Sequence, residues 1–528
     1  MHRLVLATAA LSLTLVAGAP AATINGTAGP DRLNGTGSAD SILGREGDDR
    51  LFGRAGDDFL LGGTGSDLVV GDDGWDRISV HADGADTVRC GGGRDIVTVD
   101  GSDRVAADCE VVTRQLSRDP VRTFRAQHQT QVEPDSFAFG STIVTAFQSG
   151  RFVDGGAANI GFATSRNAGP SEFATDPVVA YDAAHGRWLI ASLAVTQNAD
   201  RFLISRSRDG VSWDRPIVAA EAVGQELAYD KEWLACDNGR MSRLRGTCYL
   251  AYLDSRRSGI DVRRSRDGGL TWSPPVAAVT DTRTSTHNGA FPVIRPDGTL
   301  VVLFIRFGYA FTEDVLAVSS NDGGVSFGPQ HRVAPVGDPT IRGMRAPTLP
   351  SAEVDAAGTI YVSWHDCQLQ EDCATSDVLL ASSRDGVSWS AVRRVPTGGG
   401  VEVDYFTPGI AVDPSSSGPR GRLAITYHSL RQCSQYVCPG IDGYLVTSED
   451  GGDTWSAPQR LTSQPMSLLW VADSHLGRML ADYISTSYVG GRPMPVFVIA
   501  SPPVGEEFRQ STFAMTRGTP LPRTARRR

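Results

Sequence analysis

The chain has 528 residues, a net charge of −10 and 41% hydrophobic residues. This length exceeds what one small core can organise, so we expect two or more folded units. The acidic balance argues against non-specific binding to nucleic acid, and we predict no nucleic-acid partner.

Residues 1–21 begin with basic residues, continue as an apolar run and end in small residues at Ala19 and Ala21. This order is typical of a secretory signal peptide. The apolar run is short for a membrane-spanning helix, and no longer one follows. We therefore predict a secreted, extracellular protein without a transmembrane segment.

Eight cysteines fall into four close pairs. In an exported chain such pairs favour disulfides over free thiols, and the spacings of a zinc site are absent. The predicted disulfides are Cys90–Cys109, Cys236–Cys248, Cys367–Cys373 and Cys433–Cys438.

Residues 22–112 contain an aspartate at every ninth position, with a glycine five residues before it and an aliphatic residue two after it. Glycine allows the chain to turn, and stacked aspartates would repel one another unless a cation lay between them. Calcium suits such a site, because it takes six to eight oxygen ligands from carboxylates and backbone carbonyls. The six regular aspartates are Asp31, Asp40, Asp49, Asp58, Asp67 and Asp76.

These nonapeptides resemble the GGxGxDxUx repeats of the RTX, or haemolysin-type, calcium-binding family. The resemblance implies a parallel β-roll with two nonapeptides per coil and Ca²⁺ between the turns of successive coils. The aspartates are then metal ligands together with Gly44, Gly53 and Gly62. A one-residue slip after Asp76 is expected to end regular ion binding, although the pattern resumes loosely at Asp86 and Asp95. The roll should fold poorly without calcium.

A second repeat occupies residues 131–516, beyond a linker at 113–130. Short runs rich in Val, Ile, Trp and Tyr alternate with Gly/Asp/Ser turns, which is typical of β-structure. A motif such as SRDGVSW recurs within these turns, and a weaker copy lies at 165–173. The clear copies lie at 207–213, 265–272, 320–327, 383–389 and 448–455.

This motif resembles the Asp box, S-x-D-x-G-x-T-W, of sialidases and related β-propellers. The resemblance implies that its Ser and Asp close a turn and that its aromatic residue packs between strands, without catalysis. The strand pattern favours seven blades over six, with a candidate ring-closing strand near 122–127. We therefore predict an all-β protein with a parallel roll, a six- or seven-bladed propeller and a disordered basic tail at 517–528.

Ligands of a propeller usually sit where the loops of one face surround the central channel. Guanidinium groups bind carboxylates bidentately, so arginines on that face could hold an anion, although they could equally be ordinary surface residues. The candidate substrate-binding residues are Arg151, Arg256, Arg306, Arg345 and Arg431.

The sialidase resemblance also implies a Tyr nucleophile activated by a Glu, and Tyr483 with Glu232 is the candidate pair. The FRIP-like motif that carries the family's first clamp arginine is absent before the first Asp box. We therefore favour recognition of an extracellular, anionic glycan or protein ligand. The alternatives are a secreted exo-sialidase-type hydrolase and a structural spacer.

Overall fold

The computed structural model describes residues 20–81, 84–117, 126–153, 156–162, 173–196, 198–224, 228–280, 285–308, 313–337, 339–399, 402–431 and 440–517. The chain divides into two compact units, Met1–Glu110 and Val111–Arg528. Within the described ranges the regular structure consists of strands and three short 3₁₀ helices, which confirms the predicted all-β class. None of the helices in these ranges is long and apolar enough to cross a membrane.

Several predicted features fall outside the described ranges. They are most of the signal peptide, the Cys433–Cys438 pair, nearly all of the weak motif at 165–173, most of the segment at 122–127 and the tail beyond residue 517.

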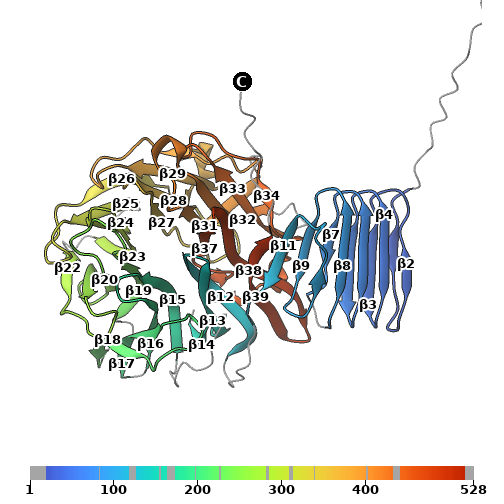
Figure 1. Cartoon of the computed structure of the whole chain (residues 1–528), viewed down its shortest axis with the longest axis horizontal. Helices are drawn as coiled ribbons and strands as arrows, with labels where there is room; N and C mark the ends of the chain where they lie inside the picture. Colours follow the sequence, from blue (N-terminus) through green and yellow to red (C-terminus); the bar gives the residue numbers. More distant parts are fainter. Residues whose placement is uncertain are drawn as a thin grey trace, which may run out of the picture. The chain divides into compact units, whose positions relative to one another are not determined.

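The first unit is a coil of short parallel strands that alternate between two sheets (Figure 1). One sheet contains β1 (Thr23–Asn25), β3 (Ser41–Glu46), β5 (Phe59–Thr64), β7 (Arg77–Ser79) and β9 (Ile96–Val99). The other contains β2 (Arg32–Asn34), β4 (Arg50–Ala55), β6 (Leu68–Asp73), β8 (Thr87–Gly92) and β10 (Arg104–Val105). The predicted parallel roll is therefore confirmed.

Strand pairing in this roll joins residues 18 positions apart, for example Ser41 with Phe59. Eighteen residues are two nonapeptides, so the aliphatic residue of each repeat stacks on its equivalent one coil later. These residues fill the interior with almost no exposed surface: Leu51, Leu60, Val69 and Ile78. After the slip the pairing separation becomes 19, as for Arg77 with Ile96, and the stack continues into Val88 and Val97.

Glycine is required where one turn packs on the next. Gly56 has a φ of 112°, a left-handed conformation, and a Cβ there would collide with the backbone of Ser38. The last coil carries the predicted Cys90–Cys109 disulfide.

The second unit begins at Val111 and consists of antiparallel sheets that follow one another along the chain. The first set has three strands, β12 (Gln127–Phe139), β13 (Thr142–Arg151) and β14 (Ala157–Phe162). The second set contains β15 (Phe173–Asp182), β16 (Arg187–Val195), β17 (Ala199–Ser207) and β18 (Ile217–Val223). The third contains β19 (Tyr229–Cys236), β20 (Cys248–Asp254), β21 (Gly259–Ser265) and β22 (Val276–Val279). The fourth contains β23 (Ser285–Ile294), β24 (Leu300–Gly308), β25 (Glu313–Ser320) and β26 (His331–Val336).

Two further sets of four and a final set follow, and β35 (Asp473–Ser474) and β36 (Gly477–Arg478) form a separate two-stranded sheet. The fifth set contains β27 (Ser351–Val354), β28 (Ile360–Asp366), β29 (Asp377–Ser383) and β30 (Arg393–Arg394). The sixth contains β31 (Val403–Val412), β32 (Leu423–Arg431), β33 (Ile441–Ser448) and β34 (Gln459–Arg460). The final set contains β37 (Ser485–Val489), β38 (Arg492–Val504), β39 (Glu507–Arg517) and β11 (Val111–Gln115).

The first strands of these sets surround a common centre (Figure 1). Each contacts the first strand of the next set, and β37 contacts β12, so the sequence of contacts closes on itself. The strand beside β39 is β11. Apolar clusters fill the space between neighbouring sheets, as around Leu189 and Leu250.

Each clear SRDGVSW-type motif closes a turn between the third and fourth strands of a set. In the second copy the Ser265 hydroxyl donates to Asp267 Oδ1 at 2.8 Å, and that oxygen accepts from the backbone N–H of Leu270 at 2.9 Å. Trp272 then packs against the core between two sheets. These side chains are engaged in the turn, as the structural interpretation of the motif predicts.

Two predicted disulfides stiffen the second unit. Cys236–Cys248 joins the adjoining ends of β19 and β20, and Cys367–Cys373 lies in the loop after β28.

We expect Leu60→Ala to destabilise the first unit by about 2–4 kcal/mol, because it opens a cavity inside the stack of aliphatic residues. Hydrogen exchange of peptides from residues 20–110 in calcium-containing buffer measures this change. Leu61→Ala is the matched control, because Leu61 lies on the same strand and faces outward. Equal losses for the two variants would contradict the buried stack.

Candidate functional site

The aspartates of the first unit form two hydrogen-bonded ladders, one along each side of the roll. In each ladder the Oδ1 atom accepts from the backbone N–H of the aspartate one coil earlier. The distances are 2.8 Å for Asp49 to Asp31, 2.7 Å for Asp58 to Asp40, 2.8 Å for Asp67 to Asp49 and 2.9 Å for Asp76 to Asp58. The ladders continue beyond the slip through Asp86 and Asp95.

The second carboxylate oxygen of several of these aspartates has no such partner. Oδ2 is buried without a hydrogen bond to another described residue in Asp49, Asp58, Asp76, Asp86 and Asp95. The two aspartates nearest the N-terminus differ, because Oδ2 of Asp31 and of Asp40 accepts from the N–H of Thr27 and of Thr36, respectively. Buried oxygens that face no donor are costly unless a cation compensates them.

Backbone oxygens converge on the same places. A Cβ on Gly53 would collide with Asp58 Oδ2 and with the carbonyl oxygen of Gly71, and Gly44 is crowded in the same way by Asp49 and Gly62. One carboxylate oxygen and one backbone carbonyl therefore approach each glycine from successive coils. Such a mixed oxygen set fits calcium, so the residues present fit the ion that the repeats imply.

No group of three or more His, Cys, Asp or Glu side chains among the described residues forms a metal-binding cluster. The 18-residue spacing explains this, because it places one aspartate per coil along each ladder and leaves the other ligands to the backbone.

Several aspartates further along the ladders hold protons more tightly than free aspartates do, whereas hydrogen bonds from Thr27 and Thr36 lower the pKa of Asp31 and of Asp40. Burial, followed by repulsion from neighbouring carboxyls, raises the pKa of Asp58 and of Asp76 to about 6. The same causes raise the pKa of Asp95 to about 7 and that of Asp86 to about 8.

In the second unit, bulges near the start of the first strands bring charged side chains to the centre that these strands surround, which we call the ring centre. The register shifts in β12, β15, β19, β23 and β31, and the bulged residue has a positive φ of 51° at Glu133, 51° at Asp176 and 44° at Lys231. A left-handed conformation costs about 1–2 kcal/mol for these residue types. Such strain is typical of functional positions.

We call Glu133, Asp176, Lys231, Arg345 and Asp482 the central charge cluster. Lys231 Nζ lies 3.7 Å from Asp176 Oδ1, and the Arg345 Nε donates to Asp482 Oδ1 at 3.0 Å. Burial, followed by Asp482 and Asp176, raises the pKa of Glu133 well above its usual value. The cluster contains three acids and two bases, and Arg151 also acts on Glu133 and Asp482. Its members are nearly closed to solvent except Arg345, whose side chain is 21% exposed.

Tyr483 and Glu232, the predicted catalytic pair, lie against this cluster. The Tyr483 hydroxyl donates to the Pro177 carbonyl at 3.2 Å, and Lys231 Nζ lies 3.4 Å from the centre of the Tyr483 ring. Glu232 has no exposed surface, and neither carboxylate oxygen is hydrogen-bonded to another described residue. Burial, followed by Asp176, raises its pKa well above the usual value.

The predicted arginines are not brought together as one clamp. Arg151 is fully buried and donates to the Met479 carbonyl at 3.2 Å. Arg256 pairs with Asp254 at 2.6 Å, Arg306 pairs with Asp314 and Arg345 pairs with Asp482. Arg431 lies exposed at the end of β32. A role for these five residues in ligand binding stays a prediction.

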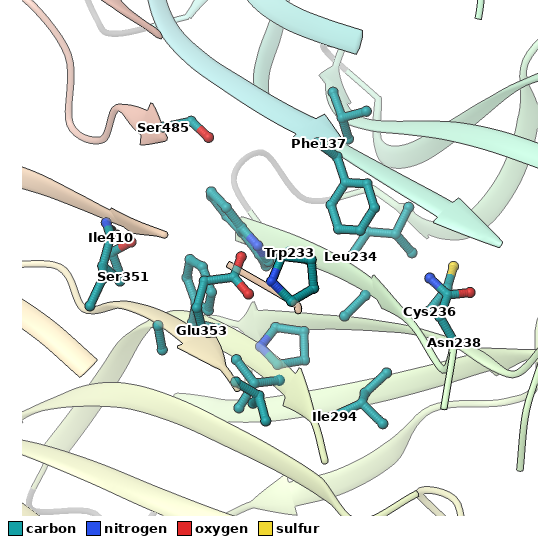
Figure 2. Close-up of a pocket in the computed structure, with 18 of the residues that line it drawn as sticks. Phe137, Trp233, Leu234, Cys236, Asn238, Ile294, Ser351, Glu353, Ile410 and Ser485 are labelled. Carbon is teal, nitrogen blue, oxygen red and sulfur yellow. Dashed lines mark hydrogen bonds between the residues drawn. The ribbon is translucent and has the colours of Figure 1, made fainter. Parts of the chain in front are cut away.

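The second unit also contains a cavity of about 320 Å³ between its first strands (Figure 2). Its lining includes the turns that join the first and second strands of several sets, at Gly239, Pro296, Ala356 and Pro414. These turns lie at the same end of the sheets as the SRDGVSW-type turns, because consecutive strands are antiparallel.

The sequence contains a signal for the bulges that strand patterns alone miss. Proline follows the bulged residue in three cases, at Pro134, Pro177 and Pro408. Proline inside a strand is confined to edges and bulges, so these positions predict irregular pairing. No comparable pattern in the sequence predicts that Glu232 is buried or which acids and carbonyl groups pair with the arginines.

A family model for the RTX calcium-binding nonapeptide repeat matches residues 25–60 and 52–82. The first unit therefore contains RTX calcium-binding repeats. Among curated proteins no match is found.

Solved structures give distant matches to most of the chain. A Hadza microbial sialidase is 15% identical over 69% of this chain and 74% of that one, with a TM-score of 0.40. An ulvan lyase is 12% identical over 75% and 97%, with a TM-score of 0.45. An α-L-arabinofuranosidase from Fusarium graminearum is 12% identical over 77% and 97%, with a TM-score of 0.42.

In the metal-free protein we expect the first unit to be more stable at pH 5 than at pH 8. Folding raises the pKa of Asp95 to about 7 and that of Asp86 to about 8, whereas both titrate near 4 in the unfolded chain. The folded state therefore binds more protons in this window, and stability falls as the pH rises through it.

Hydrogen exchange of residues 20–110 with a chelator, at both pH values, measures this dependence. Saturating calcium should remove it, because the ion favours the ionised carboxylates. Equal or greater protection at pH 8 in chelator would show that the ladders are not destabilised by charge.

Proposed function

We propose that this protein is exported, that its first unit folds around Ca²⁺, and that its second unit is a seven-bladed propeller that binds an extracellular ligand. The observation that carries the calcium part is the row of buried Oδ2 atoms without partners. The cysteine pairs and the RTX repeats support an extracellular location.

The residues that would hold calcium come from successive coils. Asp49, Asp58, Asp67 and Asp76 supply carboxylate oxygens, and Gly62 and Gly71 supply carbonyls. The ion supplies positive charge between carboxylates that otherwise repel one another. Asp31 and Asp40 are weaker candidates, because threonine N–H groups already satisfy their Oδ2 atoms.

The seven-blade proposal rests on the closed order of contacts among the first strands. The seven sets begin with β12, β15, β19, β23, β27, β31 and β37. β11 supplies the fourth strand of the last set and so joins the start of the unit to its end. Closure of this kind leaves few exposed sheet edges.

Binding is favoured over hydrolysis for the second unit. A glycosidase of the sialidase type would need substrate to reach Tyr483 and Glu232, and both side chains are buried beside Lys231. Hydrolysis remains the second candidate, because a buried carboxyl close to a tyrosine is a recognised way of preparing a nucleophile.

Calcium titration of the full-length protein by calorimetry tests the first part. We expect Asp58→Asn to weaken the affinity of the sites next to it by about tenfold or more, because ligand charge sets calcium affinity. Asp73→Asn is the matched control, since Asp73 is exposed on the same unit. Unchanged affinity and stoichiometry in Asp58→Asn would overturn the assignment.

A panel of fluorogenic glycosides, sialosides included, separates binding from catalysis. The proposal predicts no turnover by the folded protein in millimolar calcium. Turnover that is lost in Tyr483→Phe and Glu232→Gln, but kept in Tyr181→Phe outside the cluster, would replace the binding proposal with hydrolysis.

A further inference from the structure

The cavity of the second unit has a largely apolar wall. Trp233 and Phe291 come from neighbouring first strands, and their rings stack with centres 4.4 Å apart at an angle of 28°. Phe137 on β12 completes an aromatic lining. The cavity can thus hold an apolar group of modest size.

Three carboxyl groups line the same space, those of Asp135, Glu353 and Asp355. The Asp355 carboxylate already accepts from the backbone N–H groups of Ala357, Thr359 and Gly418. Figure 2 shows the Glu353 carboxyl directed toward the interior, on the side where Trp233 lies. Asp135 is 4% exposed, and its Oδ2 accepts from the Val179 N–H at 2.7 Å. Burial raises the pKa of Asp135 to about 7, and burial with the nearby Asp135 raises the pKa of Glu353 to about 8.

Few charges from the surrounding strands compensate these carboxyls. Lys231 acts on Asp135 but is also paired with Asp176 and lies 4.4 Å from the centre of the Trp233 ring. The Ser136 N–H and the Ser485 hydroxyl hydrogen-bond to Asp135, and Tyr483 lies near it. Arg295 also lines the cavity, but its guanidinium donates to the Gly358 carbonyl at 3.1 Å and to Asp297 at 3.0 Å. The described lining therefore offers acids and aromatic rings without a basic group committed to Glu353.

We propose that this cavity binds an organic cation, an ammonium group on a compact apolar body, with Glu353 and Asp135 as its counter-ions. An ammonium group would let both carboxyls ionise, and the apolar wall would hold the body of the ligand. An anion would meet three acids and, within the described lining, a guanidinium that is already hydrogen-bonded, so this cavity does not suit the anionic ligand expected from the sequence. The inference rests on the proposed ligand-binding role of the second unit and names its ligand class.

The ammonium group can belong to a free amine or to a lysine side chain of another protein. The two sources share their chemistry and differ in the backbone that follows the side chain. 2-Phenylethylammonium represents the first source, and Nα-acetyl-lysine amide, which keeps its ε-ammonium group, represents the second. 2-Phenylethanol is the neutral match, because it has the same ring and arm without the charge.

Calorimetry of the full-length protein in calcium, near pH 7, in two buffers of different ionisation enthalpy, tests the proposal. We expect at least one of the two ammonium probes to bind, at least tenfold more tightly than 2-phenylethanol, with release of protons as the carboxyls ionise. Which of the two binds more tightly identifies the source.

Glu353→Gln should weaken ammonium binding at least tenfold, and Asp135→Asn provides a second, independent loss. Glu506→Gln is the matched control, because Glu506 is exposed in the turn between β38 and β39. Circular dichroism and the calcium titration show for each variant whether both units are folded.

Equal affinity for 2-phenylethanol, or full ammonium binding by folded Glu353→Gln and Asp135→Asn, overturns the proposal. So does the absence of binding by both ammonium probes. If the calcium titration is normal in that case, the calcium function stands and only the cavity assignment fails. If calcium binding is lost and ammonium binding is intact, the cavity assignment stands and only the calcium function fails.

Discussion

The register between successive copies of a repeat fixes which side chains meet, and both units are organised by it. In the roll, an 18-residue register places each aspartate against the aspartate of the next coil, so like charges accumulate inside the structure. In the second unit the repeated aspartates, such as Asp267, are satisfied within their own turns and never meet. Several aspartates of the first unit therefore keep a buried Oδ2 without a donor, whereas the repeated aspartates of the second unit are hydrogen-bonded within their turns.

The charges at the ring centre follow a different rule, because they come from irregularities in the repeat. Bulges in the first strands turn Glu133, Asp176 and Lys231 inward, and Arg345 and Asp482 complete the group. Lys231 pairs with Asp176 and Arg345 pairs with Asp482 there, so both basic groups are already engaged. The cavity that lies further along the same strands holds acids without such compensation, which makes it chemically distinct from the cluster.

The sequence predicted best those features that depend on contacts between neighbouring copies of a repeat. The nine-residue spacing determines the coil, the stack of Leu51, Leu60 and Val69, and the aspartate ladders, because each depends only on the neighbouring copy. The hydrogen-bonded ladder continues through Asp86 although a one-residue slip changes the pairing separation to 19, and the predicted end of regular ion binding there stays a prediction. Sequence reasoning placed three of the disulfides correctly from spacing. It could not foresee that Arg151 would be buried against carbonyl groups or that Glu353 would face a cavity, because those environments are built by distant parts of the chain.

Lys231 is the one lysine of the chain, and its side chain is 7% exposed, held between the rings of Trp233 and Tyr483. The folded protein therefore presents almost no ε-amino surface to its surroundings. Reagents and modifications that act on lysine, including amine-reactive dyes, aldehyde cross-linkers and sugar-derived glycation, would report on opening of the ring centre. Reactivity at this single position is thus a built-in probe of whether the second unit is closed.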